Sequence, residues 1–492
     1  MLTIEEIKQF MDEDATSMKK RYARKGQAYY EGEHDIKDFE LYYCDANGNW
    51  IPDKLRSNIK ISHPFFTELV DQATQYILSG DDAFMKSDIP ELQTELDAYF
   101  NDNEDFLAEL SEVLTDCQTK GFSYMFGYKN AEDRLAFQCA DSIGVVEVEA
   151  RFASDGKEHV LYHYIDRIDK EGKKIKRIMD WNAEEVWFYI QDGEGEIVKD
   201  ETIAMNPKPH TVYKEEGKEG LYQDSFGFIP FFRLDNNKKQ FSSLKTIKEL
   251  IDDYDLMACG LSNNLQDASE YLVVVSGFQG DNLDELVTNT KVKKHIGVDG
   301  DGGVEFKTVD VPYQARQTKL DLDEKNIYRF GFGLNTSGLK DTNATTNIAI
   351  KSAYSLLDLK CSKLIIRLKQ LLRKILKVVL DEINTEQGTD YQQKDIYFDF
   401  KPQVMSNAQE NAQIALTEAQ TRQAEITTLQ NLATLLDNET LMQLICEQLD
   451  IDYEEIKGKL PDPDEAENAI KTAQTDLNDV VVEDGVNDVS VG

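Results

Sequence analysis

"GFGLNTSGLKDTNATTNIAIKSAYSLLDLK", Gly331 to Lys360, joins a glycine-rich loop to the start of a long helix. The loop has the outline of a phosphate-binding loop, because two of its glycines are separated by four residues and a lysine follows. That motif requires Gly-x4-Gly-Lys-Ser/Thr, with the hydroxyl on magnesium. Here Leu339 intervenes before Lys340, and Asp341, which repels phosphate, stands in place of the hydroxyl. A polar loop that caps a helix therefore explains the stretch better than a nucleotide site.

The helix after this loop is predicted to run from Thr345 to about Glu386, which corresponds to roughly 60 Å at 1.5 Å per residue. Between Lys351 and Lys377 it carries eight basic residues and one acid, Asp358. Its basic face could pair with an acidic flank of another copy, contact DNA phosphates, or simply be solvated. The candidate residues of this face are Lys351, Lys360, Lys363, Arg367, Lys374 and Lys377.

The composition limits the functions that the chain can have. Its 492 residues suffice for two to four domains, and 54 basic against 92 acidic residues give a formal charge of −38. Such a chain repels indiscriminate contact with nucleic acid or anionic membrane, so any DNA contact needs local basic patches. The six cysteines are scattered, which suits reduced thiols. The sequence shows neither a signal-peptide pattern nor 18 consecutive apolar residues.

Periodicity predicts helices in the first quarter of the chain and strands in the second. Residues 1–30 predict one amphipathic helix, and Asn47-Gly48 predicts a hairpin turn. Residues 63–80 predict another helix, and residues 90–127 two more. Short alternating runs, bounded by Asp-Gly and Glu-Gly turns, predict a β-rich segment over residues 134–233.

The second half is predicted to be mainly helical. It contains predicted helices over 243–270, 282–294, 313–328, 345–386 and 406–460, a strand over 271–280, a hairpin over 295–311 with Asp299–Gly303 at its tip, and a strand over 395–405. The tail from Pro461 has nine acids and one lysine, which is typical of a disordered segment.

Several motifs, in this order, resemble those of the portal proteins of tailed bacteriophages, in the branch typical of long-tailed phages of Gram-positive hosts. "YYEGEHDI" (Tyr29–Ile36) resembles that family's Tyr-x-Gly-x-His-x-Ile pattern. "SNIKISHPFFTELVDQATQYILSG" (Ser57–Gly80) is similar to its Asn-x-Lys-Ile segment, although its end is one residue longer. "FGFIPFFRLDNN" (Phe226–Asn237) and the helix after it resemble the family's Gly-x-Ile-Pro turn and stem helix. The resemblance covers roughly residues 25–400.

This resemblance implies an α+β, portal-like fold. Its parts would be a mixed α/β wing (1–240, with the β-rich part at 134–233), a stem helix (241–271), a small α/β clip (272–311), a second stem helix (312–330), a tunnel loop (331–344), a long wing helix and strand (345–402), an α-helical crown (403–460) and an acidic disordered tail (461–492). The stem and long helices are expected to bury their apolar stripes against other copies of the chain.

The resemblance also implies a function. The chain would form a ring, twelve-fold in virions, at one capsid vertex, through which double-stranded DNA is packaged and ejected. The expected partners are the terminase packaging motor, the head-tail connector, and the scaffold and major capsid proteins, with no membrane, cofactor or catalytic residue. The protein would be found in the virion, and in the host cytoplasm during assembly. A helical scaffold or filament protein is the main alternative, and a nucleotide-binding enzyme the next.

A channel that moves DNA should not grip it, because each neutralised phosphate strengthens binding. A polar tunnel loop with few cations fits this requirement and could shift as DNA passes. Its candidate residues are Gly333, Asn335, Thr336, Ser337, Gly338, Lys340, Asn343 and Thr345. Lys291, Lys293 and Lys294 form a short basic patch in the clip, which either docks a partner or is solvated.

Two other motifs are weak metal-site candidates. His159 and His163 lie in a strand pattern that separates them by about 13 Å, so ordinary core or surface histidines are favoured. Asp299–Gly303 lacks most ligands of a calcium loop. The sequence therefore predicts no metal site.

Overall fold

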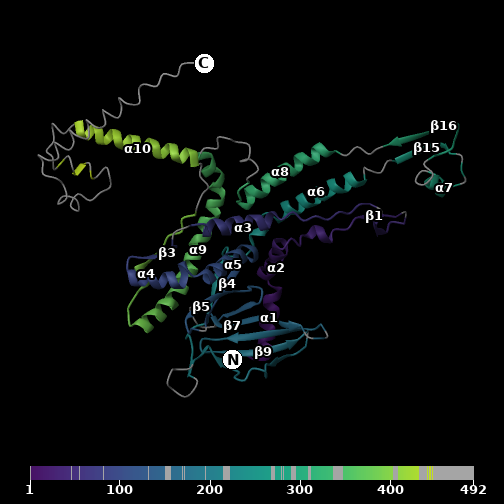
Figure 1. The fold of residues 1–492 in the computed structure, drawn as a ribbon. Coiled ribbons are helices and arrows are strands. Elements are labelled where there is room, and N and C mark those ends of the chain that lie inside the picture. Colours follow the sequence, from purple (N-terminus) through teal and green to yellow (C-terminus); the bar gives the residue numbers. More distant parts are fainter. Residues whose placement is uncertain are drawn as a thin grey trace, which may run out of the picture. The chain divides into compact units, whose positions relative to one another are not determined.

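The computed structural model divides the chain into two compact units, Met1–Met405 and Ser406–Gly492, which are described separately. Figure 1 labels the elements. The residues that the structure describes are 2–45, 47–54, 56–80, 83–130, 132–149, 157–168, 170, 172–193, 195–213, 222–267, 272–278, 280, 282–289, 295–307, 312–335, 347–402, 408–431, 440, 443–444 and 446.

The N-terminal segment forms two helices rather than the single predicted one. α1 (Ile4–Thr16) and α2 (Met18–Tyr30) are separated at Ser17, whose backbone is extended with ψ 149°. The Ser17 side chain accepts a hydrogen bond from the Lys20 amide at 3.4 Å and so caps α2. A serine that caps a new helix competes with continuation of the old one, which the hydrophobic period does not reveal.

The largest core lies among α3 (Phe65–Leu78), α4 (Pro90–Leu96), α5 (Glu104–Lys120) and α9 (Asn347–Gln387). A π-helical stretch (Asp97–Asn101) extends α4. A two-stranded sheet of β3 (Met85–Ser87) and β17 (Ile396–Phe398) borders this core. A 3₁₀ turn at Gln393–Asp395 directly precedes β17.

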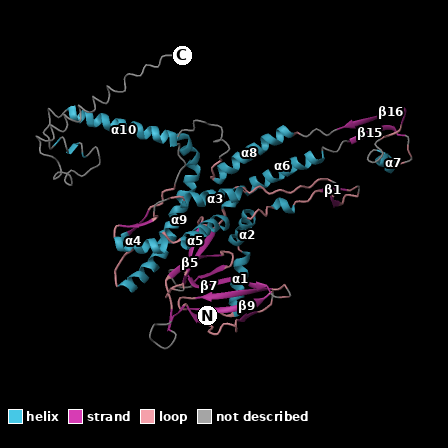
Figure 2. Ribbon diagram, viewed as in Figure 1, coloured by secondary structure: helices cyan, strands magenta, loops and turns pink. Residues whose placement is uncertain are grey.

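Helices and sheets are mixed within the first unit, as Figure 2 shows, which is consistent with the α+β class. A three-stranded sheet has the order β14-β4-β5, and a second sheet has the order β10-β9-β8-β7-β6 with β11 paired to β9. The bounds are β4 Phe122–Lys129, β5 Leu135–Ala140, β6 Val145–Glu149, β7 Lys157–Ile168, β8 Lys174–Trp181, β9 Glu185–Asp192, β10 Ile197–Lys199, β11 Lys208–Pro209 and β14 Phe231–Asp235, with β12 Thr211–Tyr213 and β13 Tyr222–Asp224 forming a separate pair.

β4 corrects the prediction that residues 90–127 are helical throughout. Its first six residues are all buried, since it is the central strand of its sheet. A strand buried on both faces is a continuous apolar run, which periodicity alone does not distinguish from a buried helix.

Between residues 243 and 331, the described parts of the chain include two long helices, a strand pair and a short helix. A 3₁₀ turn (Ser243–Thr246) leads into α6 (Lys248–Asp267), and β15 (Leu272–Phe278), α7 (Leu283–Thr288), β16 (Val298–Lys307) and α8 (Tyr313–Gly331) follow. The prediction of a hairpin tip at Asp299–Gly303 is wrong, because β16 runs through these residues and pairs with β15 across a register shift. A Cβ at Gly302 would lie 2.6 Å from the Ser276 carbonyl oxygen, so glycine permits the close backbone approach there.

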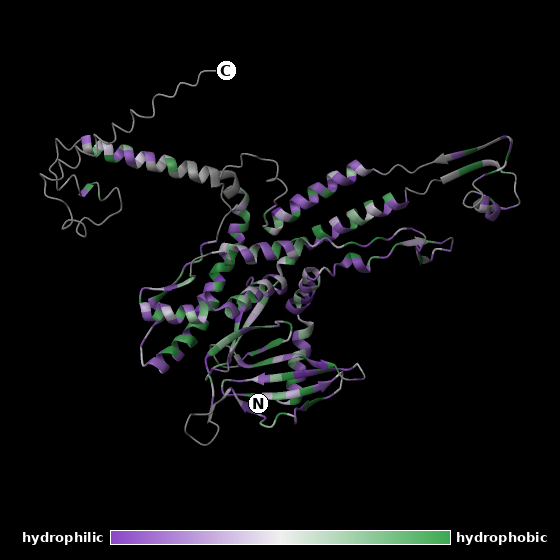
Figure 3. Ribbon diagram, viewed as in Figure 1, coloured by the Kyte–Doolittle hydropathy of each residue, from purple (hydrophilic) through white to green (hydrophobic). Residues whose placement is uncertain are grey.

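α9 buries the apolar stripe that the sequence predicts, and Figure 3 shows hydrophobic and hydrophilic residues alternating along it. The stripe packs inside its own subunit, so the expectation that α9 buries it against other copies is wrong. Its members are Leu357, Leu364, Leu368, Leu371, Leu372, Ile375 and Val379, each at most 4 % exposed. In the second unit, α10 (Ala408–Asn431) is a single helix.

Candidate channel and assembly site

α6 and α8 lie side by side and antiparallel (Figure 1). The Lys319 ammonium bridges them, because it reaches Asp253 on α6 at 2.5 Å and also Asp323, one turn further along α8. Asp323 is buried, and the two carboxylates raise the pKa of Lys319. Nearer the other end of α6, a Cβ at Gly260 would lie 2.8 Å from the Arg316 guanidinium, so glycine leaves room for this arginine to cross.

The segment 57–63 lies along α6 and is bound to it by a regular ladder of hydrogen bonds. Every second backbone amide of the segment donates to a side chain of α6, and these side chains are four residues apart. The pairs are Ser57 to Asp267 (3.2 Å), Ile59 to Asn263 (2.6 Å), Ile61 to Cys259 Sγ (3.2 Å) and His63 to Asp255 (3.0 Å).

The ladder is possible because two structural repeats have nearly the same length. Two residues of extended chain span about 6.6 Å. Four residues of α-helix span about 6.0 Å. Alternate amides of the extended segment therefore stay in register with one line of side chains on α6. The helix side chains thus take the place that a neighbouring strand would have in a sheet.

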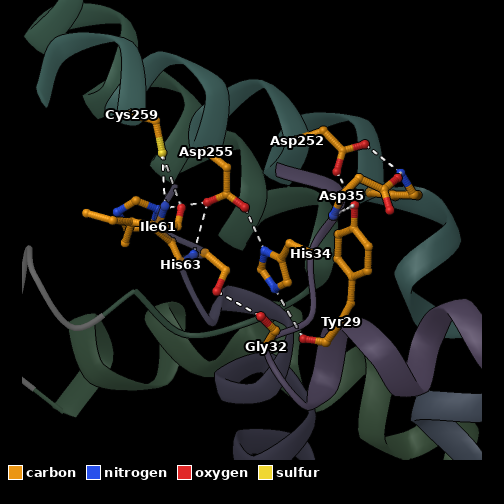
Figure 4. A network of polar contacts seen from close by, with 11 residues as sticks. Tyr29, Gly32, His34, Asp35, Ile61, His63, Asp252, Asp255 and Cys259 are labelled. Atoms are coloured by element: carbon orange, nitrogen blue, oxygen red, sulfur yellow. Dashed lines mark hydrogen bonds and ion pairs between the residues drawn. The ribbon is translucent and has the colours of Figure 1, made fainter. Parts of the chain in front are cut away.

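The segment 57–63 is the end of a longer stretch, residues 34–63, that leaves α6 and returns to it. Asp255 binds both ends of this stretch, as Figure 4 shows. Its carboxylate accepts from His34 Nδ1 at 2.6 Å and from His63 Nδ1 at 2.7 Å. His34 Nε2 also faces the Tyr29 carbonyl at 3.2 Å, so both ring nitrogens of His34 face oxygen acceptors. Burial alone would raise the pKa of Asp255, but the hydrogen bonds from both histidines lower it below the ordinary 3.8.

We call residues 34–63 the arm. Its outgoing and returning halves lie together, with the Asp53 amide 2.7 Å from the Leu41 carbonyl. The outgoing half begins with a 3₁₀ turn (Asp35–Asp38), and the arm ends in the predicted hairpin, where β1 (Tyr42–Cys44) pairs with β2 (Trp50–Pro52).

A second cluster binds the base of the arm to the start of α6. The Lys248 ammonium contacts Asp35 at 2.7 Å and Asp252 at 2.6 Å, and Lys25 contacts Asp35 at 2.6 Å. Partial burial opposes ionisation of Asp35, but the two ammonium groups lower its pKa to about 2. The Tyr29 hydroxyl donates to Asp252, which joins this cluster to the residues around His34.

The start of the predicted tunnel loop is anchored on α3. α8 ends with Phe332 in the left-handed conformation, at φ 58°. A Cβ at Gly333 would lie 2.0 Å from Leu69 Cδ2, so only glycine fits there without rearrangement. Gln72 both accepts from the Leu334 amide at 2.9 Å and donates to its carbonyl at 3.0 Å. A helix leads into this loop, whereas a phosphate loop follows a strand.

Other predicted site residues differ in how far the structure describes them. Asn335 donates to Glu324 at 3.1 Å. The remaining loop residues Thr336, Ser337, Gly338, Lys340, Asn343 and Thr345, and the clip residues Lys291, Lys293 and Lys294, lie outside the described residues.

The predicted basic face of α9 is not uniform. Lys360 is half-buried and donates to the Leu69 carbonyl at 3.3 Å, and burial lowers its pKa to about 8. Arg367 is also half-buried. Lys363, Lys374 and Lys377 are exposed, and the side chain of Lys351 lies outside the described residues. Of the five candidates whose side chains the structure describes, three are therefore exposed to a partner or solvent.

The two histidines of the weak metal motif both lie in β7. His159 Nδ1 is 2.6 Å from Asp180, and both residues are buried. Burial and the charge of Lys176 lower the pKa of His163 to about 4. Within the described ranges, the structure contains no cluster of three or more His, Cys, Asp or Glu side chains that could hold a metal ion. None of the helices described there is long and apolar enough to span a membrane.

Sequence reasoning missed the ladder along α6. A signal was present, since Asp255, Cys259, Asn263 and Asp267 recur at intervals of four residues on a helix. Such a line resembles an ordinary polar helix face. The segment that this line binds, residues 57–63, is about 200 positions away in the sequence. The sequence pattern of α6 alone therefore does not reveal what these side chains bind.

The comparisons with known proteins give the family. The family model "Phage portal protein, SPP1 Gp6-like" matches residues 11–457. This chain belongs to that family. The portal protein of Bacillus phage SPP1 is 25% identical over 379 residues, which cover 73% of this chain and 71% of that protein. The portal protein of Clostridium phage phiCD119 is 25% identical over 433 residues, covering 84% and 89%. The resemblance found in the motifs is thus confirmed, and the chain functions as a phage portal protein.

Proposed function

We propose that copies of this chain form a twelve-membered ring at one capsid vertex, with α6 and α8 as the stem around a channel for double-stranded DNA. The observation that carries the ring is the exposed apolar surface of this helix pair. Leu256 and Leu265 on α6 and Leu322 on α8 are 43, 56 and 54 % exposed. In a ring, a heterologous contact with the next copy would cover such side chains.

The proposal assigns the parts of the chain to the parts of a portal. Residues 1–240 form the wing, and residues 272–311 form the clip, which docks the packaging motor and later the head-tail connector. Residues 331–344 form the tunnel loop. The long helix and strand occupy 345–402, the crown 403–460, and the acidic tail 461–492. The scaffold and major capsid proteins are further partners of the ring.

The chemistry of the stem supports weak contact with DNA. α6 carries one lysine and five acids, and α8 carries four basic residues and three acids. This excess of acid keeps counterion release small, so a duplex would slide through without being held. Portal proteins are structural components of the virion, and the proposal assigns no catalytic residue and no cofactor.

Electron microscopy of the purified protein tests the ring. We expect annular particles with a central hole in negative stain, and a particle mass that is twelve times the mass of the chain. Rods would favour a filament or scaffold protein instead. Monomers under all conditions would contradict the proposal, and tight magnesium-dependent nucleotide binding would favour an enzyme.

A further inference from the structure

The tip of the arm exposes an unusual amount of aromatic and aliphatic surface. It is a hairpin of three residue pairs in which all six residues are exposed. An isolated two-stranded hairpin is marginally stable in water, and large exposed apolar groups mark interaction sites. The large exposed side chains of the arm are Phe39 (40 %), Tyr42 (51 %), Tyr43 (47 %), Trp50 (73 %), Ile51 (36 %) and Ile61 (46 %).

The arm is held in place rather than loosely attached. Its base is bound at Asp255 through His34 and His63, and its returning half is bound to α6 as far as Asp267. Since α6 positions the arm, the hairpin is presented in the direction of the Asp267 end of the helix (Figure 1). A positioned aromatic surface loses little conformational entropy on binding, which favours a specific partner.

We propose that the β1–β2 hairpin of one copy docks on the first half of α8 in the next copy. The proposal rests on the ring described above, because a rotation about the channel axis preserves height along the stem. α8 runs antiparallel to α6, so it begins near the Asp267 end of α6. The hairpin of one copy therefore lies at the height of the Tyr313 end of α8 in its neighbour.

The two surfaces are complementary in charge and in apolar character. The segment from Asp38 to Asp53 contains four acids and no lysine or arginine. α8 carries Arg316 before its first acid, Asp321, and its N-terminus adds positive dipole charge, whereas Lys319 is already paired with Asp253 and Asp323. Tyr313, at this end, is 60 % exposed. An acidic, aromatic hairpin thus meets a basic helix end with an exposed aromatic ring.

Crosslinking through Cys44 tests the contact directly. Cys44 lies in β1 and is exposed, whereas Cys139 is half-buried and the other four cysteines are buried. In assembled Gln314→Cys rings, a short bismaleimide should produce a ladder of covalent multimers on a denaturing gel. Tyr397→Cys, at an exposed site on β17, is the matched control and should give no ladder. Adding Cys44→Ser to Gln314→Cys should abolish it.

A second measurement uses Trp50. Trp181 is 7 % exposed and Trp187 is half-buried, so iodide quenching of the subunit reports chiefly on Trp50. Quenching should fall on ring formation, and Trp50→Ala should raise the concentration for half-assembly about tenfold, as loss of an aromatic hot spot does. Ile168→Ala, another exposed position, should leave it unchanged.

The outcomes separate this inference from the proposed function. Rings with a Cys44-dependent ladder and a protected Trp50 support the docking. Rings in which Cys44 forms no crosslink and Trp50 stays accessible overturn the docking but leave the proposed function intact. Absence of rings under all conditions overturns the proposed function and the docking with it.

Discussion

The buried carboxylate of Asp255 accepts three hydrogen bonds. Its two oxygens accept from His34 and from the ring and amide of His63, so one side chain holds both ends of the arm. In a buried position, removal of one partner leaves the others unpaired, which costs far more than loss of a surface ion pair.

The substitution Asp255→Ala should therefore lower the free energy of unfolding of the unassembled subunit by about 3–5 kcal/mol at pH 7. The measurement is urea denaturation. Because the pKa of Asp255 is lowered on folding, its contribution is present above the ordinary pKa of 3.8 and is lost as the pH falls through the folded pKa. The difference between wild type and variant should hence shrink below about pH 4.

Asp253→Ala is the matched control, since this residue lies on the same helix but is 44 % exposed in its ion pair with Lys319. This substitution should lower the free energy of unfolding by less than about 1 kcal/mol. Equal effects of the two substitutions would show that Asp255 does not anchor the arm.

Whereas the charge of Asp255 stabilises the folded subunit, the charge of Lys360 destabilises it. Burial lowers its pKa from 10.5 to about 8, so between these values the unfolded chain holds more protons than the folded chain. The free energy of unfolding should rise with pH in that window. Lys360→Met should remove the rise and should stabilise the subunit at pH 7 by on the order of 2 kcal/mol.

Exposed Lys363, on the same helix, provides the control for this experiment. Lys363→Met should change neither the stability nor its pH dependence between pH 8 and 10.5. If Lys360→Met instead destabilises the subunit and retains the rise with pH, the ammonium at position 360 is not the group that burial penalises.

At the scale of elements, α6 is the organising helix. It packs against α8 on one side and binds the arm along another, so its side chains serve two neighbours that are distant in sequence. The ladder of hydrogen bonds holds the arm against α6 along most of the helix. It can do so because two residues of extended chain and four residues of helix have nearly the same length.

Hydrogen exchange can test the ladder one bond at a time. Asn263→Ala removes the acceptor of the Ile59 amide, which is 2.6 Å away in the wild type. A net contribution of about 1 kcal/mol per bond predicts roughly fivefold faster exchange at Ile59 and its neighbours. Asn264→Ala, one residue further around the helix, is the control and should leave exchange in the arm unchanged. Unchanged exchange in Asn263→Ala would contradict the ladder.

For the whole molecule, net charge governs assembly. A formal charge of −38 per subunit makes copies repel one another at low ionic strength. Salt screens this repulsion, since the Debye length falls from about 30 Å at 0.01 M to about 8 Å at 0.15 M.

Ring formation should therefore increase with salt between 0.01 and 0.15 M, as measured by the fraction of annular particles at fixed subunit concentration. Sodium chloride and an uncharged osmolyte at equal osmolality provide the comparison. Dissociation of rings with added salt would show that ion pairs between subunits outweigh the repulsion.

The sequence determined the features that depend on local pattern. The period of α9 and the alternation in β7, β8 and β9 follow from apolar spacing, and the turn at Asn47-Gly48 follows from residues that tolerate positive φ, as Gly48 does at 84°. The ordered motifs pointed to the family as well, which the family model confirms.

Only the tertiary structure decided what each face meets. The stripe of α9 packs in its own subunit, β4 is a central strand, and the polar line on α6 binds residues 57–63. Spacing fixes which side chains share a face, because backbone geometry is local. What that face contacts depends on segments hundreds of residues apart, whose meeting is set by packing of the whole chain.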